Sequence, residues 1–281
     1  MALVCLIVLT RDEEANLPAL IESARGLDAE LHVVDSGSTD RTVEIAAQAG
    51  AQIHRRPWKT YADQFNWALG SIATDAPWTM RMDADERFTP GLVSELNGLL
   101  ATLPAEVSGL RLRRQVWFWG RWIRHGGYYP IWLLRVWRTG MGRVEDRWMD
   151  EHVILSAGRE FDLAHDIIDE NRKGLGFWTA KHNGYADREV EDILSGAPDD
   201  PAGLSGQARR TRLLKNRLYL RLPLFFRAWA YWMYRYVLRG GFRDGIPGLV
   251  FHFLQGFWYR FLVDAKLVER RRLAARDESG R

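Results

Sequence analysis

An unbroken apolar run near the N-terminus constrains the fold most. Residues 2–9 are Ala-Leu-Val-Cys-Leu-Ile-Val-Leu, a run of strand length without a polar position. A strand that faces water on one side alternates between apolar and polar residues, whereas a strand covered on both faces does not. The run therefore predicts a central strand of a parallel sheet with helices on both faces.

Strand and helix patterns alternate after this run. Apolar residues at helical spacing from Leu17 to Leu27 predict a helix that leads to a second strand at residues 31–34. Further strands are predicted at residues 51–54 and 78–80, and Ser38 or Thr39 is expected to cap the helix between the second and third strands. This order predicts an α/β fold with a doubly wound, mainly parallel sheet.

Three polar clusters directly follow predicted strands: Thr10–Glu14, Asp35–Thr39 and Asp83–Glu86. Ligands of open α/β sheets bind beyond the carboxyl ends of the strands, so we expect the clusters to share one edge. The following helices open with neither G-x-G-x-x-G nor G-x-x-x-x-G-K-[ST]. A dinucleotide cofactor and a P-loop are therefore not expected.

The cluster Asp83-Ala84-Asp85-Glu86 places three carboxylates in four positions. Such carboxylates repel one another unless a cation lies between them, and Mg²⁺ in proteins takes one or two carboxylates together with substrate phosphates. The cluster predicts a divalent metal and a phosphorylated ligand. The alternative is a solvated acidic turn before the helix that begins near Thr89, because a D-x-D triplet also arises by chance.

The C-terminal quarter of the chain differs in charge from the rest. Residues 212–281 hold 15 Lys/Arg and 5 Asp/Glu, which leaves 24 basic and 31 acidic groups in residues 1–211. The basic part also holds 15 aromatic residues, but apolar runs such as residues 249–251 do not suit a nucleic-acid surface. We predict no nucleic-acid partner, and helices that lie on an anionic membrane surface.

The longest apolar segment of this C-terminal quarter is too short to cross a bilayer. Its longest uncharged run, residues 246–259 with His252 neutral, has fourteen residues, against about 20 for a spanning helix. Helix breaks are predicted near Leu222-Pro223 and Gly240-Gly241, and a turn-rich linker over residues 186–207. We expect one domain over residues 1–205 and an amphipathic helical region over residues 206–281. The alternative for the aromatic residues is a core or a homo-oligomer interface.

The single cysteine and the N-terminus bear on the compartment. Cys5 has no partner within the chain and lies in the apolar run, which favours a reducing cytoplasm and a packing role. The first residues carry neither a basic region nor a small-residue cleavage site, so we predict no signal peptide.

Several blocks of the sequence resemble family 2 glycosyltransferases, in particular bacterial lipopolysaccharide core enzymes that include a core β-1,4-glucosyltransferase. The blocks are Leu9–Glu14, Val33–Thr42, Met82–Arg87, residues 120–130, residues 134–138 and residues 241–245. The resemblance implies a GT-A fold and inverting transfer of a hexose such as glucose from a UDP-linked or other nucleoside-diphosphate sugar to a lipid-anchored glycan. Residues 1–205 would form the catalytic domain. Departures from the subgroup are Asp12 for Asn, Phe65 for Arg, and Asp150-Glu151 for His-Glu.

The resemblance assigns residues to the sugar donor. Asp35 would contact the nucleotide base or ribose, because an acceptor-only carboxylate suits N–H and hydroxyl donors. Shaping of its loop is the alternative. Thr10 and Glu13 would line the same nucleotide-binding site, and Arg135 and Lys181 would neutralise the charge of the diphosphate oxygens.

The resemblance also assigns metal ligands and a base. Asp85 and Asp83 would bind Mg²⁺ or Mn²⁺, and Asp83 would also face the ribose of the donor. His165, which follows a strand predicted at residues 161–164, is a further candidate ligand, and His152 and His182 are less favoured candidates. The alternative is that these histidines have structural roles. Glu151 is the expected base, with Asp150 second, since only one of two adjacent side chains on an extended segment can face the sugar. A salt-bridged loop acid is the alternative.

Three functions remain in competition. The leading one is a metal-dependent inverting glycosyltransferase, bound peripherally to the cytoplasmic face of the membrane, that acts on a lipid-linked glycan. The second is a polyprenyl-phosphate glycosyltransferase, against which the absence of long apolar segments argues. The third is a non-catalytic membrane-binding module, against which the intact carboxylates argue.

Overall fold

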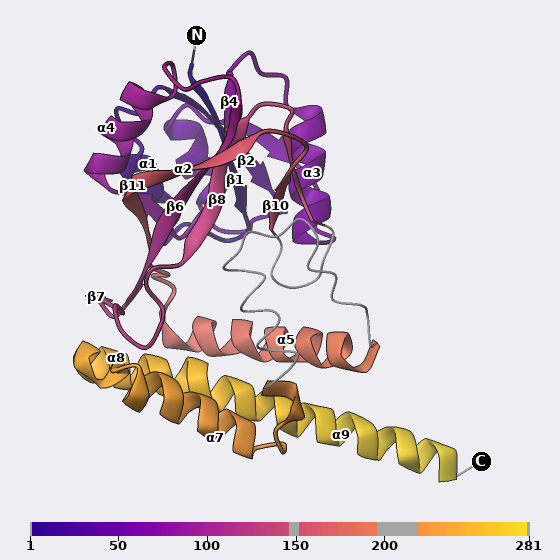
Figure 1. Cartoon of the computed structure of the whole chain (residues 1–281). Helices are drawn as coiled ribbons and strands as arrows, with labels where there is room; N and C mark the ends of the chain where they lie inside the picture. Colours follow the sequence, from indigo (N-terminus) through magenta and orange to yellow (C-terminus); the bar gives the residue numbers. More distant parts are fainter. Residues whose placement is uncertain (1, 146–151, 196–218, 280–281) are drawn as a thin grey trace. The chain divides into compact units, whose positions relative to one another are not determined.

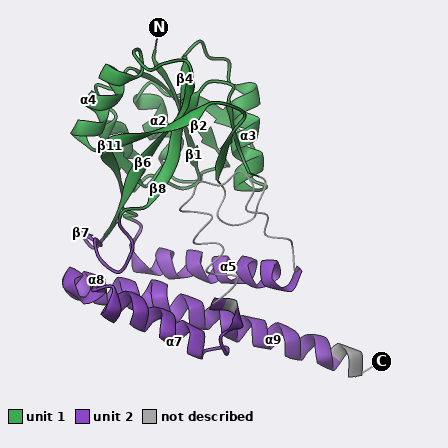
Figure 2. Ribbon diagram, in the orientation of Figure 1, with its two compact units in different colours: residues 1–117, 130–172 green, residues 118–129, 173–281 purple. Residues whose placement is uncertain are grey.

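The computed structural model describes residues 2–145, 152–195 and 219–279. The chain forms two compact units (Figure 2). One unit comprises residues 1–117 and 130–172, and the other comprises residues 118–129 and 173–281. The boundary predicted between residues 205 and 206 lies outside the described residues.

The first unit is built on a mixed sheet with the strand order β3-β2-β1-β4-β8-β6-β11-β5 (Figure 1). The strands are β1 (Val4–Thr10), β2 (Ala29–Asp35), β3 (Gln52–Arg55), β4 (Trp78–Asp83), β5 (Glu86–Phe88), β6 (Val107–Phe118), β8 (Trp132–Arg138) and β11 (Arg159–Asp169). β1 pairs in parallel with β2 and β4, and β2 pairs in parallel with β3. The predicted central strand and the parallel arrangement around it are confirmed. β8 is antiparallel to β4 and β6.

Helices cover both faces of this sheet, as the sequence predicts. They are α1 (Leu17–Ser23), α2 (Thr42–Gln48), α3 (Tyr61–Ser71) and α4 (Pro90–Leu99). Val4, Leu6 and Val8 of β1 share a core with α1, α2 and α4. Cys5 and Ile7 share a core with α3. Since successive side chains of a strand point to opposite faces, the apolar run supplies both cores.

The predicted capping of α2 by Ser38 or Thr39 is wrong. Arg41 precedes the helix, and its side chain makes no capping hydrogen bond. The Ser38 hydroxyl instead donates to Asp35, and the Thr39 N–H donates to Asp12 Oδ1 at 2.7 Å. Asp12 has a φ of 53°, a left-handed conformation that Asn and Asp tolerate better than most residues. This explains why either residue type fits at position 12.

The second unit is helical. It contains α5 (Gly174–Ser195), α7 (Phe226–Met233), α8 (Gly245–Phe251) and α9 (Tyr259–Ser279), with short turns η1 (Tyr219–Arg221) and η3 (Gly241–Asp244) and π-helical segments η2 (Tyr234–Leu238) and η4 (His252–Trp258). Ala186 and Val190 of α5 pack against Val263 and Leu267 of α9. The predicted breaks near residues 222–223 and 240–241 are confirmed. The predicted linker is wrong over residues 186–195, which continue α5, and its remainder lies outside the described residues.

The remaining strands are small. β7 (Arg121–Trp122) pairs with β6, while β9 (Gly142–Val144) and β10 (Val153–Leu155) pair with each other.

Candidate active site

The three predicted polar clusters meet at one edge of the sheet. Thr10 at the end of β1 is in register with Asp35 at the end of β2. On the other side of β1, Leu9 is in register with Asp83 at the end of β4. Neighbouring strands lie about 4.8 Å apart, so the clusters are side by side, as predicted.

Asp35 is surrounded by donors from its own loop and from β1. It is 2% exposed. Its Oδ1 accepts from the Thr10 hydroxyl at 3.1 Å and from the Ser38 hydroxyl, and its Oδ2 accepts from the N–H groups of Gly37 and Ser38, both at 2.9 Å. These hydrogen bonds fix the Asp35 carboxylate to the loop after β2.

The loop after β1 is tied to the loop after β2. The Glu13 N–H donates to Thr42 Oγ1 at 2.7 Å, and the Asp12 N–H donates to Ser38 Oγ at 2.9 Å. Glu13 Oε2 accepts from the Asn16 amide at 2.7 Å. Thr10 is thus held on Asp35 by its own hydrogen bond, and Glu13 is tied to the start of α2.

Asp83 is fixed by hydrogen bonds at both of its carboxylate oxygens. The Tyr61 hydroxyl donates to Oδ1 at 3.0 Å, and Arg135 of β8 donates to Oδ2 at 3.1 Å. The Arg81 guanidinium lies 4.1 Å from the centre of the Tyr61 ring. Burial opposes ionisation of Asp83, but the charges of Arg135 and Arg81 outweigh it and hold the pKa of Asp83 below its ordinary value. Asp83 is therefore a carboxylate at neutral pH.

Asp85 differs from Asp83 in its contacts. It is half-buried, and Asn171 donates to its Oδ2 at 2.9 Å. The backbone carbonyl of Asp85 accepts from the Glu170 N–H at 2.9 Å. Among the described residues, Oδ1 of Asp85 has no hydrogen-bond partner, so this oxygen can face a ligand.

Asn171 was not predicted from the sequence. It follows the end of β11, at the position that the strand-end rule would have singled out had the end of this strand been placed correctly. Its amide fixes the orientation of the Asp85 carboxylate.

The structure does not bring His165 to Asp85. The strand end predicted at Ala164 is wrong, because β11 continues to Asp169 and His165 lies within it. Its Nδ1 lies 2.8 Å from Glu95 Oε2. Five residues of extended strand separate His165 from Glu170, which corresponds to about 16 Å.

Two further predicted residues, Lys181 and His182, belong to α5 of the second unit, where the His182 ring stacks on Trp178 with centres 3.5 Å apart. His152 Nδ1 lies 3.9 Å from Glu145 Oε2. Asp150 and Glu151 lie outside the described residues.

A second group of metal-ligating side chains lies in the first unit, near the opposite ends of β1 and β2. Potential ligand atoms of Cys5, Glu30 and His32 lie within 4.8 Å of one another. Burial raises the pKa of the Cys5 thiol to about 12. Metals bind the thiolate, which this environment disfavours, so the group has no part in the candidate site.

Glu86 gives the site a pH-dependent contribution to stability. It is 1% exposed, contacts Arg135, and accepts from the Asp83 N–H at 2.9 Å. Burial raises its pKa from 4.5 to about 8, against the attraction of Arg135. The folded protein therefore keeps a proton on Glu86 in a pH range where the unfolded chain has lost it.

We expect the free energy of unfolding to fall as the pH rises from 4.5 to about 8, with a slope of at most about 1.4 kcal/mol per pH unit from this group. Glu86→Gln removes the titration, so its stability should fall less over the same range. Denaturant unfolding at a series of pH values measures the difference, with the exposed Glu22→Gln as control. Parallel curves for the wild type and Glu86→Gln would contradict the assignment.

Known proteins resemble this chain in sequence and in fold. The profile of Glycosyl transferase family 2 matches residues 5–167. The lipopolysaccharide core biosynthesis glycosyltransferase LpsC of Rhizobium meliloti (strain 1021) is 31% identical over 291 residues, which cover 96% of this chain and 93% of LpsC. An uncharacterized glycosyltransferase of Rickettsia typhi is 35% identical over 95 residues, which cover 34% of this chain and 32% of the relative.

A solved structure shares the fold over most of its length. The mannosyltransferase PcManGT from Pyrobaculum calidifontis, in complex with GDP-Man and Mn²⁺, superposes with a TM-score of 0.55 at 14% identity. The match covers 95% of this chain and 87% of PcManGT.

Proposed function

The chain belongs to glycosyl transferase family 2, and we propose on this premise that it transfers a hexose such as glucose, with inversion, from a nucleoside-diphosphate sugar to a lipid-anchored glycan. The family match and the likeness to LpsC along nearly the whole chain identify it as a glycosyltransferase related to lipopolysaccharide core biosynthesis. One observation supports the donor site most: Thr10, Asp35 and Asp83 lie side by side at the carboxyl ends of adjacent strands. A UDP-linked donor and a lipopolysaccharide core acceptor are the proposed specific pair.

Asp85 is the proposed ligand of a divalent cation, Mg²⁺ or Mn²⁺. Carboxylate oxygens are the ligands that these hard ions prefer, and Oδ1 of Asp85 accepts no hydrogen bond within the described residues. The ion, when bound, would supply positive charge for the leaving diphosphate. Asn171 would keep the Asp85 carboxylate oriented, since it binds the other oxygen. We exclude His165 from the proposed metal ligands because its Nδ1 is within hydrogen-bond distance of Glu95 Oε2.

Thr10, Glu13 and Asp35 form the proposed nucleotide seat. Their hydrogen bonds hold the two loops in one conformation before the donor arrives, which lowers the ordering cost of binding. Asp83 is the proposed ribose-side residue. Arg135, which pairs with both Asp83 and Glu86, is proposed to position Asp83 and so to act on the donor indirectly.

The remaining roles follow the family resemblance. Glu151 is the proposed base that takes the proton of the acceptor hydroxyl, with Asp150 second, and Lys181 is a proposed diphosphate contact. We further propose that residues 206–281 bind the cytoplasmic face of the membrane, where a lipid-anchored acceptor would be found, while the catalytic residues belong to residues 1–205.

Nucleotide sugars should stabilise the purified protein in the presence of Mg²⁺ or Mn²⁺, because a ligand that binds only the folded state raises the melting temperature. We expect the largest shift from a UDP-sugar, and transfer to lipopolysaccharide core with inverted anomeric configuration, observed by NMR. Polyprenyl phosphate offered as acceptor is the comparison arm. Transfer to that lipid alone would favour the polyprenyl-phosphate enzyme, and retained configuration would exclude a single displacement.

A further inference from the structure

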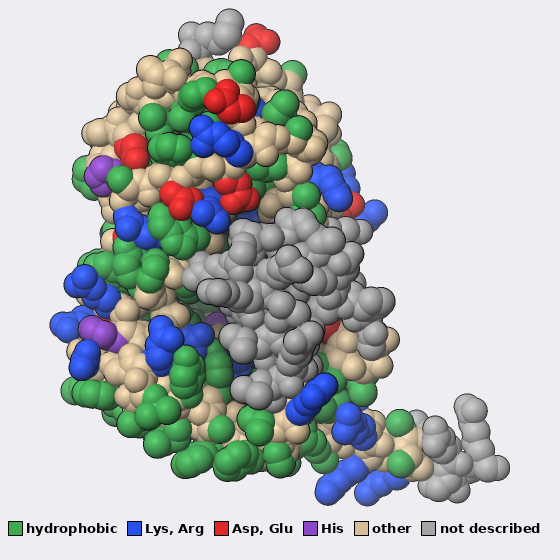
Figure 3. All heavy atoms as spheres, in the orientation of Figure 1, with side chains coloured by type: hydrophobic (Ala, Val, Ile, Leu, Met, Phe, Trp, Pro, Cys, Tyr) green, Lys and Arg blue, Asp and Glu red, His purple; other side chains and the backbone are tan. Residues whose placement is uncertain are grey.

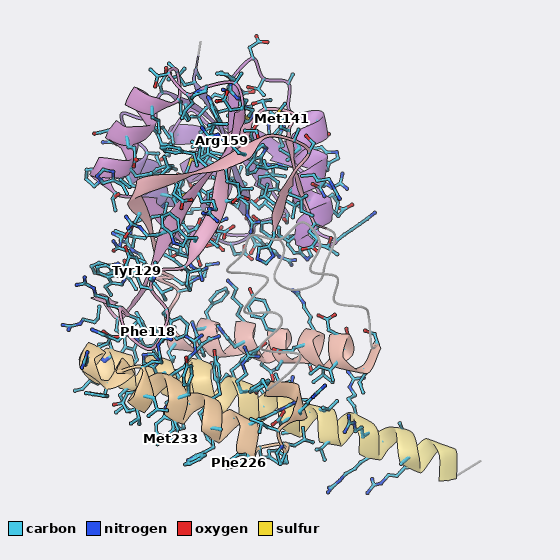
Figure 4. All side chains as sticks on the ribbon, viewed as in Figure 1. Phe118, Tyr129, Met141, Arg159, Phe226 and Met233 are labelled. Carbon is cyan, nitrogen blue, oxygen red and sulfur yellow. The ribbon has the colours of Figure 1, made fainter. Side chains whose placement is uncertain are left out.

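The second unit carries a row of phenylalanine side chains that are exposed or, for Phe257, partly buried. We call this row the aromatic face. It comprises Phe225, Phe253, Phe257 and Phe261. Neighbouring ring centres lie 5.5 Å apart for Phe253 and Phe257, 5.6 Å for Phe257 and Phe261, and 4.8 Å for Phe261 and Phe225. Figure 3 shows a band of hydrophobic side chains along the helices of this unit, and Figure 4 labels the adjoining Phe226, which is 51% exposed. A soluble protein rarely exposes so continuous an apolar surface without a partner.

Further exposed apolar side chains lie at the end of η2, within η3 and in the first turn of α8. We call this group the tip. Leu238 is 77% exposed, Ile246 is 73% exposed and Phe242 is 51% exposed. Leu238 and Ile246 are the most exposed large apolar side chains among the described residues. The tip therefore offers aliphatic and aromatic groups that are largely exposed to solvent.

The acidic side chains of this region are buried and not exposed at its surface. Between residues 219 and 268 the chain has two acids, Asp244 and Asp264, which are 2% and 0% exposed. Arg227 donates to Asp264 from its Nε at 2.7 Å, and His125 Nδ1 lies 2.6 Å from Asp244 Oδ1. The exposed charged residues of this stretch are Arg221, Arg239 and Arg243. The surface is thus apolar and positive, with no exposed carboxylate in this stretch.

The segment 118–129 adds to the same positive surface. The His125 N–H donates to Asp244 Oδ2 at 2.9 Å, the Gly126 N–H donates to the Arg239 carbonyl at 3.1 Å, and Arg235 donates to the Gly126 carbonyl at 2.9 Å. These bonds fix the exposed Arg124 next to the turn that carries the tip.

Two glycines permit this close docking. A Cβ at Gly126 or at Gly241 would overlap the ring of His252, which is fully buried. Residues 120–130 and 241–245, to which the donor site gives no role, therefore build one local structure around His252.

We propose that the tip and the aromatic face together bind an anionic lipid bilayer. Leu238, Phe242 and Ile246 enter the boundary between headgroups and acyl chains, and the arginines 124, 239 and 243 contact lipid phosphates. None of the described helices is long and apolar enough to cross a membrane. In this proposal the helices lie in the plane of the interface. The inference deepens the proposed function, on which it rests, because it names the residues and the lipid charge that bring the enzyme to its acceptor.

A bilayer fits this surface better than a second copy of the chain does. A two-fold interface places the same patch of both copies face to face. The arginines of the two copies would then repel each other without a carboxylate of this patch to pair with. Anionic phosphates supply the missing charge.

Vesicle flotation with the full chain tests the proposal. We expect binding to vesicles of phosphatidylcholine mixed with phosphatidylglycerol, and weak binding to phosphatidylcholine alone. The triple variant Leu238→Ser, Phe242→Ser, Ile246→Ser should bind the vesicles at least about tenfold more weakly than the wild type, because the apolar area that enters the membrane is lost. The variant Arg239→Gln, Arg243→Gln should lose the preference for the anionic vesicles.

Matched controls come from the first unit. Met141→Ser removes an exposed apolar side chain, and Arg25→Gln removes an exposed charge. Both should bind vesicles like the wild type, and thermal melts should show that all variants are folded. Equal binding by the wild type and both tip variants would overturn the proposal, as would a wild-type dimer in solution that the triple variant converts to monomer.

Failure of the inference and failure of the proposed function give different results. Sugar transfer to a detergent-dispersed acceptor without vesicle binding by the wild type would reject the bilayer surface and keep the enzyme. Vesicle binding without turnover of any nucleotide sugar would reject the proposed transfer reaction and keep the surface. Asp85→Asn should bind vesicles normally.

Discussion

Asp85→Asn should lower sugar transfer about 10²–10³-fold or more while the protein stays folded. The variant keeps an oxygen that can accept from Asn171, so the local hydrogen bond survives. It removes the negative charge that the proposed cation needs, and with it the electrostatic stabilisation of the leaving diphosphate. Release of nucleoside diphosphate, followed as a function of Mn²⁺ concentration, measures the effect.

The control for this variant is Asp75→Asn, which neutralises an exposed aspartate of the same unit away from the strand ends. It should leave both transfer and its metal dependence unchanged. Full activity of Asp85→Asn at every metal concentration would reject the ligand role.

Arg135→Gln should destabilise the first unit by roughly 3 kcal/mol above pH 8, because it leaves the buried, ionised Glu86 and the partly buried Asp83 without their shared cation. Asp83 would keep Arg81 and the Tyr61 hydroxyl, whereas Glu86 would lose its contact with a guanidinium. Denaturant unfolding at a pH above about 8, where Glu86 is ionised in the wild type, measures the loss. Transfer activity should fall as well, since Asp83 would no longer be fixed at the end of β4.

A second substitution separates charge from packing at this position. In the double variant Arg135→Gln, Glu86→Gln the uncompensated acid is neutral, so part of the lost stability should return. Arg25→Gln, whose ion pair with Glu22 is largely exposed, should change little. A loss of similar size for Arg25→Gln, or no loss for Arg135→Gln, would contradict this account.

The parallel half of the sheet was predictable because its sequence pattern is clear. β1 is apolar up to its last residue, and β1, β2 and β4 end on the polar residues Thr10, Asp35 and Asp83. The strand-end rule then brought Thr10, Asp35 and Asp83 together without knowledge of the strand order.

The mixed half was less predictable, and the error over His165 shows why. β11 pairs with β6 through register shifts between Arg159 and Glu160 and between Asp162 and Asp166. A shift interrupts the alternation of apolar and polar positions on which strand prediction depends. The strand was therefore ended five residues early, and Asn171 was missed.

The pairing of Arg135 with Asp83 and Glu86 could also not be predicted from the sequence. Its partners come from β4 and from the start of β5, and the antiparallel register of β4 and β8 is set by tertiary packing. Phe65 is a similar case. The sequence marked it as a departure from related enzymes, and the structure shows a fully buried ring 6.1 Å from both Tyr61 and Trp137.

The course of the chain between the two units limits how this protein can be divided. The polypeptide passes from one unit to the other at residues 117–118, 129–130 and 172–173. A single truncation therefore cannot remove the whole helical unit. Deleting everything after residue 205 would remove α9, which packs against α5, and would expose Ala186 and Val190. It would also remove Asp244, which binds His125 in the segment 118–129. Exchanging the helical unit between related enzymes would therefore require residues 118–129 and residues 173–281 to be exchanged together.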